Sequence, residues 1–459
     1  MTLQKFRLAA TGVRITIGAV VAIACALGVT AAVAAPWPQL RTNPATVTVA
    51  PVPGNTNLVC NGSFRALGRD ASQADRMVSA AAPRLRVEAA DGAAEKTALE
   101  MPGLSGGVGA QTITGAVVDR KAPLIAASEA FSLNEEDLRG FAAAPCREAS
   151  MRSWLVGGDV STGAADVILL SNPGSVPATV DLNVYGVQRS ATTTVVPPQT
   201  QVGLSLASVS AGEQRPVIEV VASGAPVRAS LQSALTRTLD PVGIDLQDGL
   251  SGAQENLHLL GVRASPATAG DDATGVVLRL LAPGSAADVT VRVHAAGSGQ
   301  AVDEYGVELV ADVPNEIALS GLKEGAYDIE VIASAPVVAG ARQTARDNSR
   351  EDFSWMLPAP QLIGKTIVSV PSGAPATLYL RNPSDEAVTV TIEGTDSRSI
   401  EVPAQGAKTV ALGVGTVTLD SADPVHAAIG MRGGEGSAAI AGWPLWAPSA
   451  TQKPIVVRQ

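Results

Sequence analysis

Histidine, cysteine and aromatic residues are all scarce in this chain of 459 residues. It has three histidines, far apart in the sequence, and no H-E-x-x-H motif, so a histidine-rich zinc site is not expected. The sequence also lacks a G-x-S-x-G nucleophile elbow, a P-loop and a G-x-G-x-x-G fingerprint. We therefore predict no catalytic residue, no metal and no cofactor, and expect a non-enzymatic protein.

Charged residues are also scarce. Asp, Glu, Lys and Arg make up 17% of the residues, and the net charge is −10. The basic residues form no cluster or stripe, so nucleic acid is not an expected partner. Hydrophobic residues reach 46%, and 45 glycines and 30 prolines accompany them. This composition favours an exported β protein.

The N-terminus has the pattern of a membrane anchor. Residues 1–14 carry three basic residues and no acid, and residues 15–35 carry no charge. A helix of that length would span roughly 30 Å, the thickness of a bilayer core. We predict a cytoplasmic basic tail (1–14), a transmembrane signal-anchor (15–35) and a Pro-rich stalk (36–44). The basic flank predicts a single-pass protein of the cell membrane with an extracellular bulk.

Two other interpretations of this segment stay open. Ala32-Val-Ala34 fits the cleavage site of a signal peptide, although such peptides have a shorter apolar core. Cys25 is a weak match to a lipoprotein site. Each alternative would still export the rest of the chain.

The remainder is organised around the stretch 171–186, which recurs at 281–294 and 381–393. In each copy an apolar run ends at a proline or an alanine–proline turn, and alternating apolar and polar residues follow. This pattern predicts a strand, a turn and a second strand with one buried face. The residues expected to point inward are Val180, Leu182, Val184, Val289, Val291, Val293, Val388, Val390 and Ile392.

A second shared segment begins at Pro226, Pro336 and Pro424. It lies 54, 54 and 42 positions after the turn, so the third copy has lost a loop or a hairpin. A repeat of about 100 residues suits a sandwich domain rather than a propeller blade. We predict an all-β fold of tandem immunoglobulin-like β-sandwich repeats after one N-terminal transmembrane helix. The expected boundaries are 45–150 for a divergent β domain with a disulfide, 151–256, 257–361 and 362–448 for the first, second and third repeats, and 449–459 for a tail.

Two features are expected in the divergent domain. Cys60 and Cys146 are the only cysteines outside the apolar segment, so a disulfide is predicted between them, with a reactive thiol as the alternative. Ser132-Leu-Asn-Glu135 has the form of a capping box and predicts a short helix through Arg139. The whole domain is a candidate degenerate copy of the repeat.

Four tryptophans fall at repeat boundaries and are the candidates for ligand or interdomain contact: Trp154, Trp355, Trp443 and Trp446. His294 and His426 occupy matched strand positions on the side away from the apolar set. We expect them to face solvent.

Several segments together resemble a known family. They are the basic tail and apolar helix, Leu58-Val-Cys60, Ala144-Pro-Cys146, Trp154-Leu-Val-Gly-Gly158, Leu170-Ser-Asn-Pro173 and Pro177-Ala-Thr-Val-Asp181. The family comprises uncharacterised actinobacterial envelope proteins with a domain of unknown function, and the resemblance covers roughly residues 47–448. It implies a membrane-anchored, exported β-rich protein and brings no catalytic residues. Ala282 departs from the pattern, because asparagine is expected there.

Three functions follow as hypotheses. The first is a non-enzymatic extracellular scaffold or binding protein of the cell envelope, with a glycan or a protein as partner. The alternative is an accessory factor in envelope polysaccharide assembly that binds glycan at the tryptophan-bearing boundaries. A hydrolase built from dispersed acids is the third.

Overall fold

The computed structural model describes residues 3–34, 46–49, 53–69, 73, 76–90, 93–210, 212–265, 275–347, 350–394, 397–433, 437–447 and 455–458. These residues belong to two units, one within 1–51 and 453–459 and the other within 52–452. Each unit is described by itself. The fold is all-β apart from one long and one short helix.

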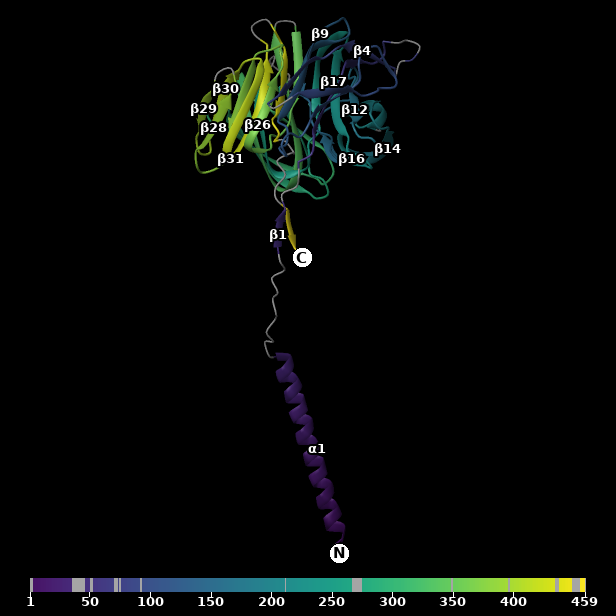
Figure 1. Ribbon diagram of the computed structural model, residues 1–459, viewed down its shortest axis with the longest axis vertical. Coiled ribbons are helices and arrows are strands. Elements are labelled where there is room, and N and C mark those ends of the chain that lie inside the picture. Colours follow the sequence, from purple (N-terminus) through teal and green to yellow (C-terminus); the bar gives the residue numbers. More distant parts are fainter. Residues whose placement is uncertain are drawn as a thin grey trace. The chain divides into compact units, whose positions relative to one another are not determined.

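The smaller unit contains helix α1 (Leu3–Ala34) and a two-stranded antiparallel sheet of β1 (Thr46–Val49) and β33 (Ile455–Arg458). Figure 1 shows α1 as one continuous helix. Within the described part of the chain, no helix combines the length and the hydropathy that crossing a bilayer requires. The predicted stalk lies outside the described residues. The pairing of β1 with β33 joins the predicted start of the first domain to the predicted tail, which the sequence did not indicate.

The larger unit begins with the N-terminal region, residues 53–150, which forms three small sheets. Its strands are β2 (Thr56–Cys60), β3 (Phe64–Ala66), β4 (Met77–Ala81), β5 (Arg84–Ala89), β6 (Ala94–Ala98), β7 (Leu104–Ser105), β8 (Gln111–Gly115), β9 (Ile125–Asn134) and β10 (Arg139–Pro145). The sheet orders are β2-β8-β6, β10-β9-β5 and β3-β4-β7, and β4 pairs with β7 in parallel. This order differs from that of the three repeats below, so the region is not a copy with the same topology.

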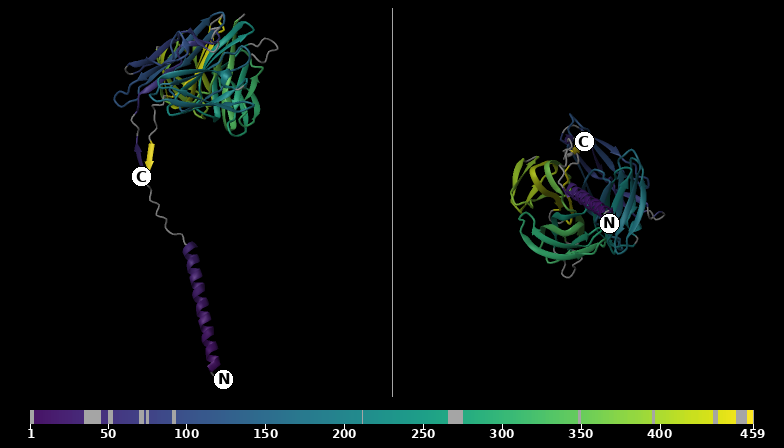
Figure 2. Two further views of the ribbon diagram at one scale, coloured as in Figure 1. Left: turned by 90° about the vertical axis from the view of Figure 1, so that its right-hand side faces the viewer. Right: turned by 90° about the horizontal axis from the view of Figure 1, so that it is seen from below.

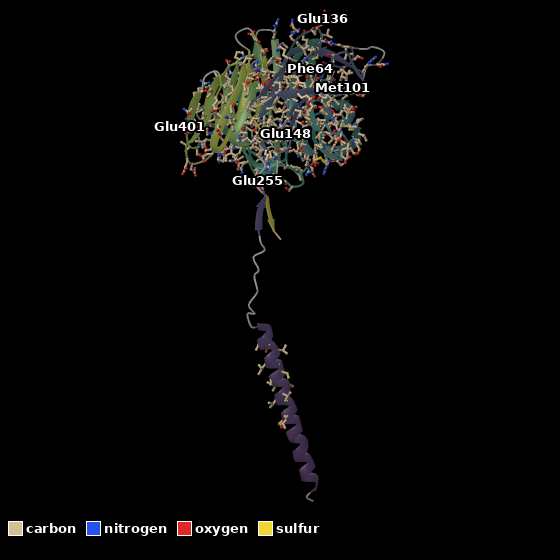
Figure 3. The ribbon with its side chains drawn as sticks, viewed as in Figure 1. Phe64, Met101, Glu136, Glu148, Glu255 and Glu401 are labelled. Carbon is tan, nitrogen blue, oxygen red and sulfur yellow. A yellow bond between two sulfur atoms is a disulfide. The ribbon has the colours of Figure 1, made fainter. Side chains whose placement is uncertain are left out.

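The helix predicted after Ser132 is wrong. Strands β9 and β10 pair directly as a hairpin, in which Asn134 lies opposite Arg139. The N–H of Glu135 donates to the carbonyl of Leu138 across the turn. Figure 3 shows Glu136 at the outer end of this hairpin. The pairing of two long strands outweighs the local preference of a capping box, because that box controls only the ends of one helical turn.

The first repeat consists of two four-stranded sheets. Its elements are β11 (Arg152–Leu155), β12 (Val167–Asn172), β13 (Ala178–Tyr185), β14 (Ser190–Val196), β15 (Thr200–Ser205), α2 (Leu206–Val209), β16 (Val217–Ser223), β17 (Arg228–Arg237) and β18 (Asp240–Asp248). The orders are β11-β16-β13-β14 and β15-β12-β17-β18. Buried residues of both sheets, among them Leu170, Leu182 and Leu231, form one core.

The second and third repeats have the same strand order, except that one long strand serves both sheets. The second contains β19 (Gln254–Ala264), β20 (Val276–Leu281), β21 (Ala287–Ala295), β22 (Ala301–Leu309), β23 (Asn315–Leu319), β24 (Gly325–Asp347) and β25 (Arg350–Met356). The third contains β26 (Gln361–Val370), β27 (Ala376–Arg381), β28 (Val388–Glu393), β29 (Arg398–Val402), β30 (Ala407–Leu412), β31 (Gly415–Arg432) and β32 (Ile440–Pro444). The predicted boundaries before 257 and 362 fall just inside β19 and β26.

The long strands β24 and β31 each replace the pair β16 and β17. The first half of β24 pairs with β19 and β21, and its second half pairs with β20 and β25. Pro336 and Pro424 lie where these strands pass from one sheet to the other, a place where a residue without an N–H is tolerated. Because the third repeat keeps every strand, its shorter spacing reflects a lost loop: β30 and β31 are joined by residues 413–414, whereas 206–216 join β15 to β16.

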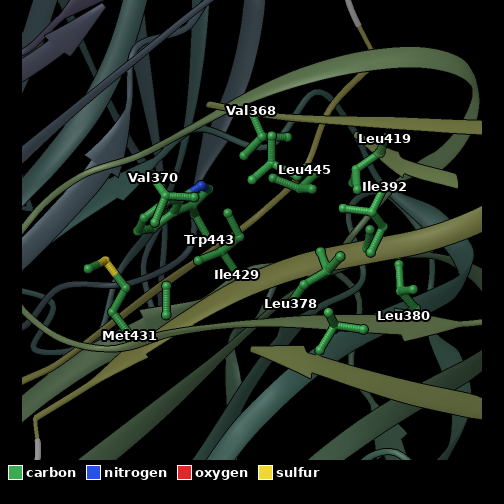
Figure 4. Packing of buried hydrophobic residues seen from close by; sticks show 14 of the residues in the cluster. Val368, Val370, Leu378, Leu380, Ile392, Leu419, Ile429, Met431, Trp443 and Leu445 are labelled. Carbon is green, nitrogen blue, oxygen red and sulfur yellow. The ribbon is translucent and has the colours of Figure 1, made fainter. Parts of the chain in front are cut away.

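The predicted alternation is confirmed in all three repeats. All nine residues expected to point inward are buried, and none exposes more than 3% of its surface. Asp181 and Thr389, which lie between two of these residues, and Asp288, which precedes Val289, are exposed. Figure 4 shows the resulting core of the third repeat, in which Leu378, Ile392 and Trp443 pack together with their neighbours.

The repeated turn is held by an asparagine side chain. Asn172 Nδ2 donates to the carbonyls of Val176 and Val196, and Asn172 Oδ1 accepts from Gly174 N. Asn382 makes the matching bonds in the third repeat. In the second repeat, where Ala282 occupies this position, Asp312 Oδ1 accepts from Gly284 N at 2.8 Å. A carboxylate on the opposite turn thus takes over part of the role of the missing amide.

The four parts of the larger unit form a closed ring. The last strand of each part contacts the next: β10 meets β18, β18 meets β25, β25 meets β32, and β32 meets β10. Figure 2 (right) shows the blue, teal, green and yellow parts following one another around this ring. The N-terminal region therefore packs against both the first and the third repeat.

Asp352 on β25 stabilises the centre of this ring. Its carboxylate accepts hydrogen bonds from Phe141 N at 2.7 Å, Ile244 N at 3.1 Å and its neighbour Phe353 N at 3.0 Å. These amides belong to three different parts of the unit. Burial is the main cause of a strongly raised pKa at Asp352. One side chain thus connects β10, β18 and β25.

The N-terminal region and the first repeat meet through buried polar groups. The Arg65 guanidinium donates to Gln201 Oε1 at 2.5 Å and to the carbonyl of Asn61 at 2.7 Å. Asn61 Nδ2 donates to Glu129 Oε1, and Gln232 exchanges two hydrogen bonds with the backbone of Arg65. Burial lowers the pKa of Arg65 to about 10 and raises the pKa of Glu129. Such a contact is specific, because each group needs its partner across the interface.

Candidate ligand-binding cavity

A cavity of about 580 Å³ lies between the first and the second repeat. Its wall from the first repeat comes from the loop after β11 and from the end of β17. Its wall from the second repeat comes from β20, β23, β24 and β25. The size suits a small ligand. The lining is rich in arginine and carries two aromatic side chains, Phe353 and Trp355.

Arg279 joins the two walls. It lies in the otherwise apolar strand β20, is 2% exposed, and donates from one nitrogen to the carbonyls of Val156, Gly158 and Pro216 in the first repeat. Gly158 has φ +95°, and a Cβ there would meet Leu206 at 2.7 Å. Only glycine therefore suits this position beside Arg279. Burial lowers the pKa of Arg279, and Glu316 raises it in part.

Ion pairs fix most of the other charges at the cavity. Glu316 lies 2.7 Å from Arg279 and 3.0 Å from Arg215. Arg237 donates to both oxygens of Glu351, at 2.9 and 3.0 Å. These three arginines are therefore already partnered by carboxylates.

Arg342 differs from them. Its guanidinium lies 5.0 Å from the centre of the Phe353 ring, and the described residues offer it no hydrogen bond and no ion pair. Its pKa is lowered by burial first and by the nearby charge of Arg237 second. This cation is thus held in the cavity wall without an anion of its own.

The acids of the first-repeat wall are used by the backbone. Asp166 is 5% exposed and accepts from Asp159 N at 2.9 Å and Ala234 N at 3.3 Å. Burial raises the pKa of Asp166 to about 7. Asp159 Oδ1 accepts from Ser161 N at 2.6 Å. Both carboxylates therefore hold the loop in shape.

Trp355 is the predicted tryptophan that lines this cavity. It is buried, its backbone N–H donates to Asp245 Oδ2 at 2.8 Å, and Arg279 lies 4.8 Å from the centre of its ring. The sequence had marked the position but none of the arginines around it. The one available sign was Arg279, a charged residue inside an apolar strand.

The other three tryptophans lie elsewhere. Trp154 contacts Tyr185 at 5.3 Å between ring centres and packs with Leu281 of the second repeat. Trp443 belongs to the core of the third repeat, together with Phe141 of the N-terminal region. Trp446 lies under Arg147, 3.5 Å from its ring centre, beside a smaller cavity of about 130 Å³. Trp443 also lines that cavity, and Trp355, Trp443 and Trp446 line a third one of about 10 Å³, so the structure brings three of the four tryptophans together and leaves Trp154 apart.

The expectation that His294 and His426 face solvent is wrong. Both are buried. His294 contacts the Gly299 carbonyl at 3.0 Å and Glu330 at 3.2 Å, and the His426 ring lies 4.4 Å from that of His258. The alternation predicts only which face of a strand a residue occupies, and here an adjoining loop or repeat covers the outer face. Over the ranges described, no group of His, Cys, Asp and Glu has the arrangement of a metal site.

The predicted disulfide is present. Cys60 and Cys146 are joined, with their Cα atoms 4.4 Å apart. The bond links the end of β2 to the residue after β10. It therefore ties the first strand of the N-terminal region to the strand that contacts the centre of the ring.

Comparison with known proteins gives a family and no activity. A search of curated proteins finds no match. A family of unknown function, DUF5719, matches residues 104–418. That stretch covers more than half of the chain, including the first two repeats, the cavity between them and most of the third repeat. By this match, the chain belongs to the DUF5719 family.

Proposed function

We propose that this protein is a non-enzymatic binding protein of the cell envelope, and that the cavity between the first and second repeats is its ligand site. The observation that carries the proposal is the lining: arginines and an aromatic floor at a boundary between repeats. A concave site with a few placed polar groups is typical of ligand binding. A glycan fits this chemistry, because the guanidinium groups and the hydroxyls of Ser161 and Thr162 can meet its polar substituents, while Phe353 and Trp355 back the arginines with apolar surface.

The state of the acids favours binding over hydrolysis. A glycosidase needs a pair of carboxyl groups free to act as acid and base or nucleophile. Here Glu316 is shared by two arginines, and Asp166 and Asp159 accept backbone N–H groups. These contacts support a role in holding the site rather than in proton transfer.

The repeats themselves are proposed to be immunoglobulin-like sandwiches. The shared strand order and the single core in each repeat support this assignment. We further propose that residues 15–35 anchor the protein in the membrane, on the strength of the uncharged run and the basic tail. Mass spectrometry of membrane fractions should then recover the intact N-terminal peptide. A mature chain that begins at Ala35 would overturn the anchor.

A glycan array probed with the full-length chain tests the binding function. Ala318 lines the cavity and is exposed, so Ala318→Trp should fill the space. Ala301 on β22 is also exposed but does not line the cavity, so Ala301→Trp is the matched control. The proposal expects that glycans are captured by the wild type and the control and lost with Ala318→Trp. If all three proteins capture the same glycans equally, the cavity is not the site.

A further inference from the structure

Among the arginines that line the cavity, one has no carboxylate in direct contact. Arg215 and Arg279 share Glu316, and Arg237 is bound by Glu351. Arg342 is the remaining arginine of the lining, and the residues described here provide it with neither a hydrogen bond nor an ion pair. A guanidinium presents several N–H donors in a plane, which matches a carboxylate in a two-bond contact.

The surroundings of Arg342 favour an added anion. Val277 on β20 and Trp355 on β25 lie directly opposite Arg342 in the sheet, so the three side chains share one face. Burial is the main cause of the lowered pKa of Arg342, the like charge of Arg237 lowers it further, and the charges of Asp159, Glu351 and Glu316 act in the opposite direction without contacting the guanidinium. A bound anion would offset both effects, because it would replace the lost hydration and screen the repulsion.

A single arginine without a direct partner suits a ligand with one negative charge. One arginine lacks a carboxylate, whereas a phosphate group brings nearly two charges and is normally held by more than one cation. Next to Arg342 the floor is aromatic, and the hydroxyls of Ser161 and Thr162 line the opposite wall. The apolar floor and the hydroxyls suit a sugar ring that carries the charge.

We propose that the cavity binds an acidic sugar and that Arg342 holds its carboxylate. This inference rests on the proposed function and goes beyond it, because it assigns the ligand to the uronic acid class and names the residue that selects it. The rest of the sugar would lie between the hydroxyls of Ser161 and Thr162 and the arginines that cover Phe353 and Trp355.

The test measures binding to pairs of oligosaccharides on the full-length chain. The probes are tetrasaccharides of glucuronic, galacturonic and mannuronic acid, each beside its neutral hexose counterpart, and the corresponding hexose 6-phosphates. At least one acidic member should bind more tightly than its neutral counterpart. Arg342→Gln should weaken that binding by about tenfold to a hundredfold, because it removes a charged hydrogen-bonding partner, and should leave neutral sugars unaffected.

Two controls make the result specific. Arg292→Gln removes an arginine on β21 whose ion pair with Glu304 on β22 does not line the cavity, and it should not change binding. Arg342→Gln should have the urea midpoint of the wild type, since it breaks no hydrogen bond or ion pair. A marked loss of stability would assign Arg342 a structural role and overturn the inference.

The outcomes separate this inference from the proposed function. If acidic and neutral sugars bind equally and Ala318→Trp blocks both, the cavity is a site but the carboxylate assignment is wrong. Tighter binding of the hexose phosphates would likewise overturn it. If no sugar binds, or if Ala318→Trp has no effect, the proposed function fails and the inference fails with it.

Discussion

Replacing Asp352 by alanine should loosen the centre of the ring. The wild-type carboxylate is 1% exposed and accepts three backbone N–H groups, from Phe141, Ile244 and Phe353. A buried N–H without a partner costs about 1–3 kcal/mol, and removal of a buried carboxylate returns part of that cost. We expect a loss of about 2–5 kcal/mol in the free energy of unfolding. Asp288→Ala removes an exposed carboxylate of the same repeat and should change the free energy of unfolding by less than about 0.5 kcal/mol.

Urea denaturation measures the free energy, and amide hydrogen exchange locates the change. In Asp352→Ala the amides of Phe141 and Ile244 should exchange faster, because they lose their acceptor on β25. In Asp288→Ala their protection should match the wild type. If both amides stay as protected in Asp352→Ala as in the wild type, Asp352 does not connect the three strands, and the account of the ring centre is refuted.

Three further outcomes are expected. Leu182→Asp places a carboxylate in the core of the first repeat, where Leu182 is fully buried, and should lower the free energy of unfolding by several kcal/mol. Asp181→Leu changes an exposed residue and should lower it by under about 1 kcal/mol. Equal tolerance of the two substitutions in thermal melts would contradict the assigned faces. Replacing Cys60 and Cys146 by serine opens a loop of 86 residues and should lower the free energy of unfolding by on the order of 4–5 kcal/mol in the chain-entropy model. Non-reducing peptide mapping of the wild type should recover one cross-linked pair rather than two free thiols. Burial raises the pKa of Asp245 from 3.8 to about 7, so its carboxyl contributes a fall in the free energy of unfolding as pH rises from about 4 to 7. Asp166 contributes in the same direction and the buried His258 and His426 in the opposite one, so the measured quantity is the difference between the wild type and Asp245→Asn. The wild type should lose stability relative to Asp245→Asn across this window, and a constant difference would count against the assignment.

Local features of the fold could be predicted from the sequence where one physical rule was enough. The period-two pattern around Leu182 predicted which residues are buried, because a shift of the strand by one residue would turn all of its apolar side chains to the outer face. The turn after Asn172 was visible as a repeated proline-containing segment. The disulfide followed from having two cysteines in a domain that was expected to be exported. Each of these depends on residues that are close in sequence or on a choice with few alternatives.

Contacts between repeats could not be predicted in the same way. The cavity combines Arg279 and Arg342 with groups from a different repeat, and nothing in the spacing of these residues indicates that they meet. His426 was expected to face solvent because the pattern describes one strand and not the neighbour that covers it. The role of Asp312 opposite Ala282 was hidden for the same reason: the substitute comes from another turn. The apolar strand that contains Arg279 was the clearest available sign of a buried charge.

The closed ring of four parts has a consequence for how this family can vary. In an open array of repeats, copies can be gained or lost at the ends, since each repeat contacts only its neighbours. Here β10 and β32 meet and leave no free end. Insertion or deletion of a whole repeat would change the angle that each part must subtend and would break the junction at Asp352. A change in copy number is therefore expected to open the ring, whereas changes in the loops would leave it closed.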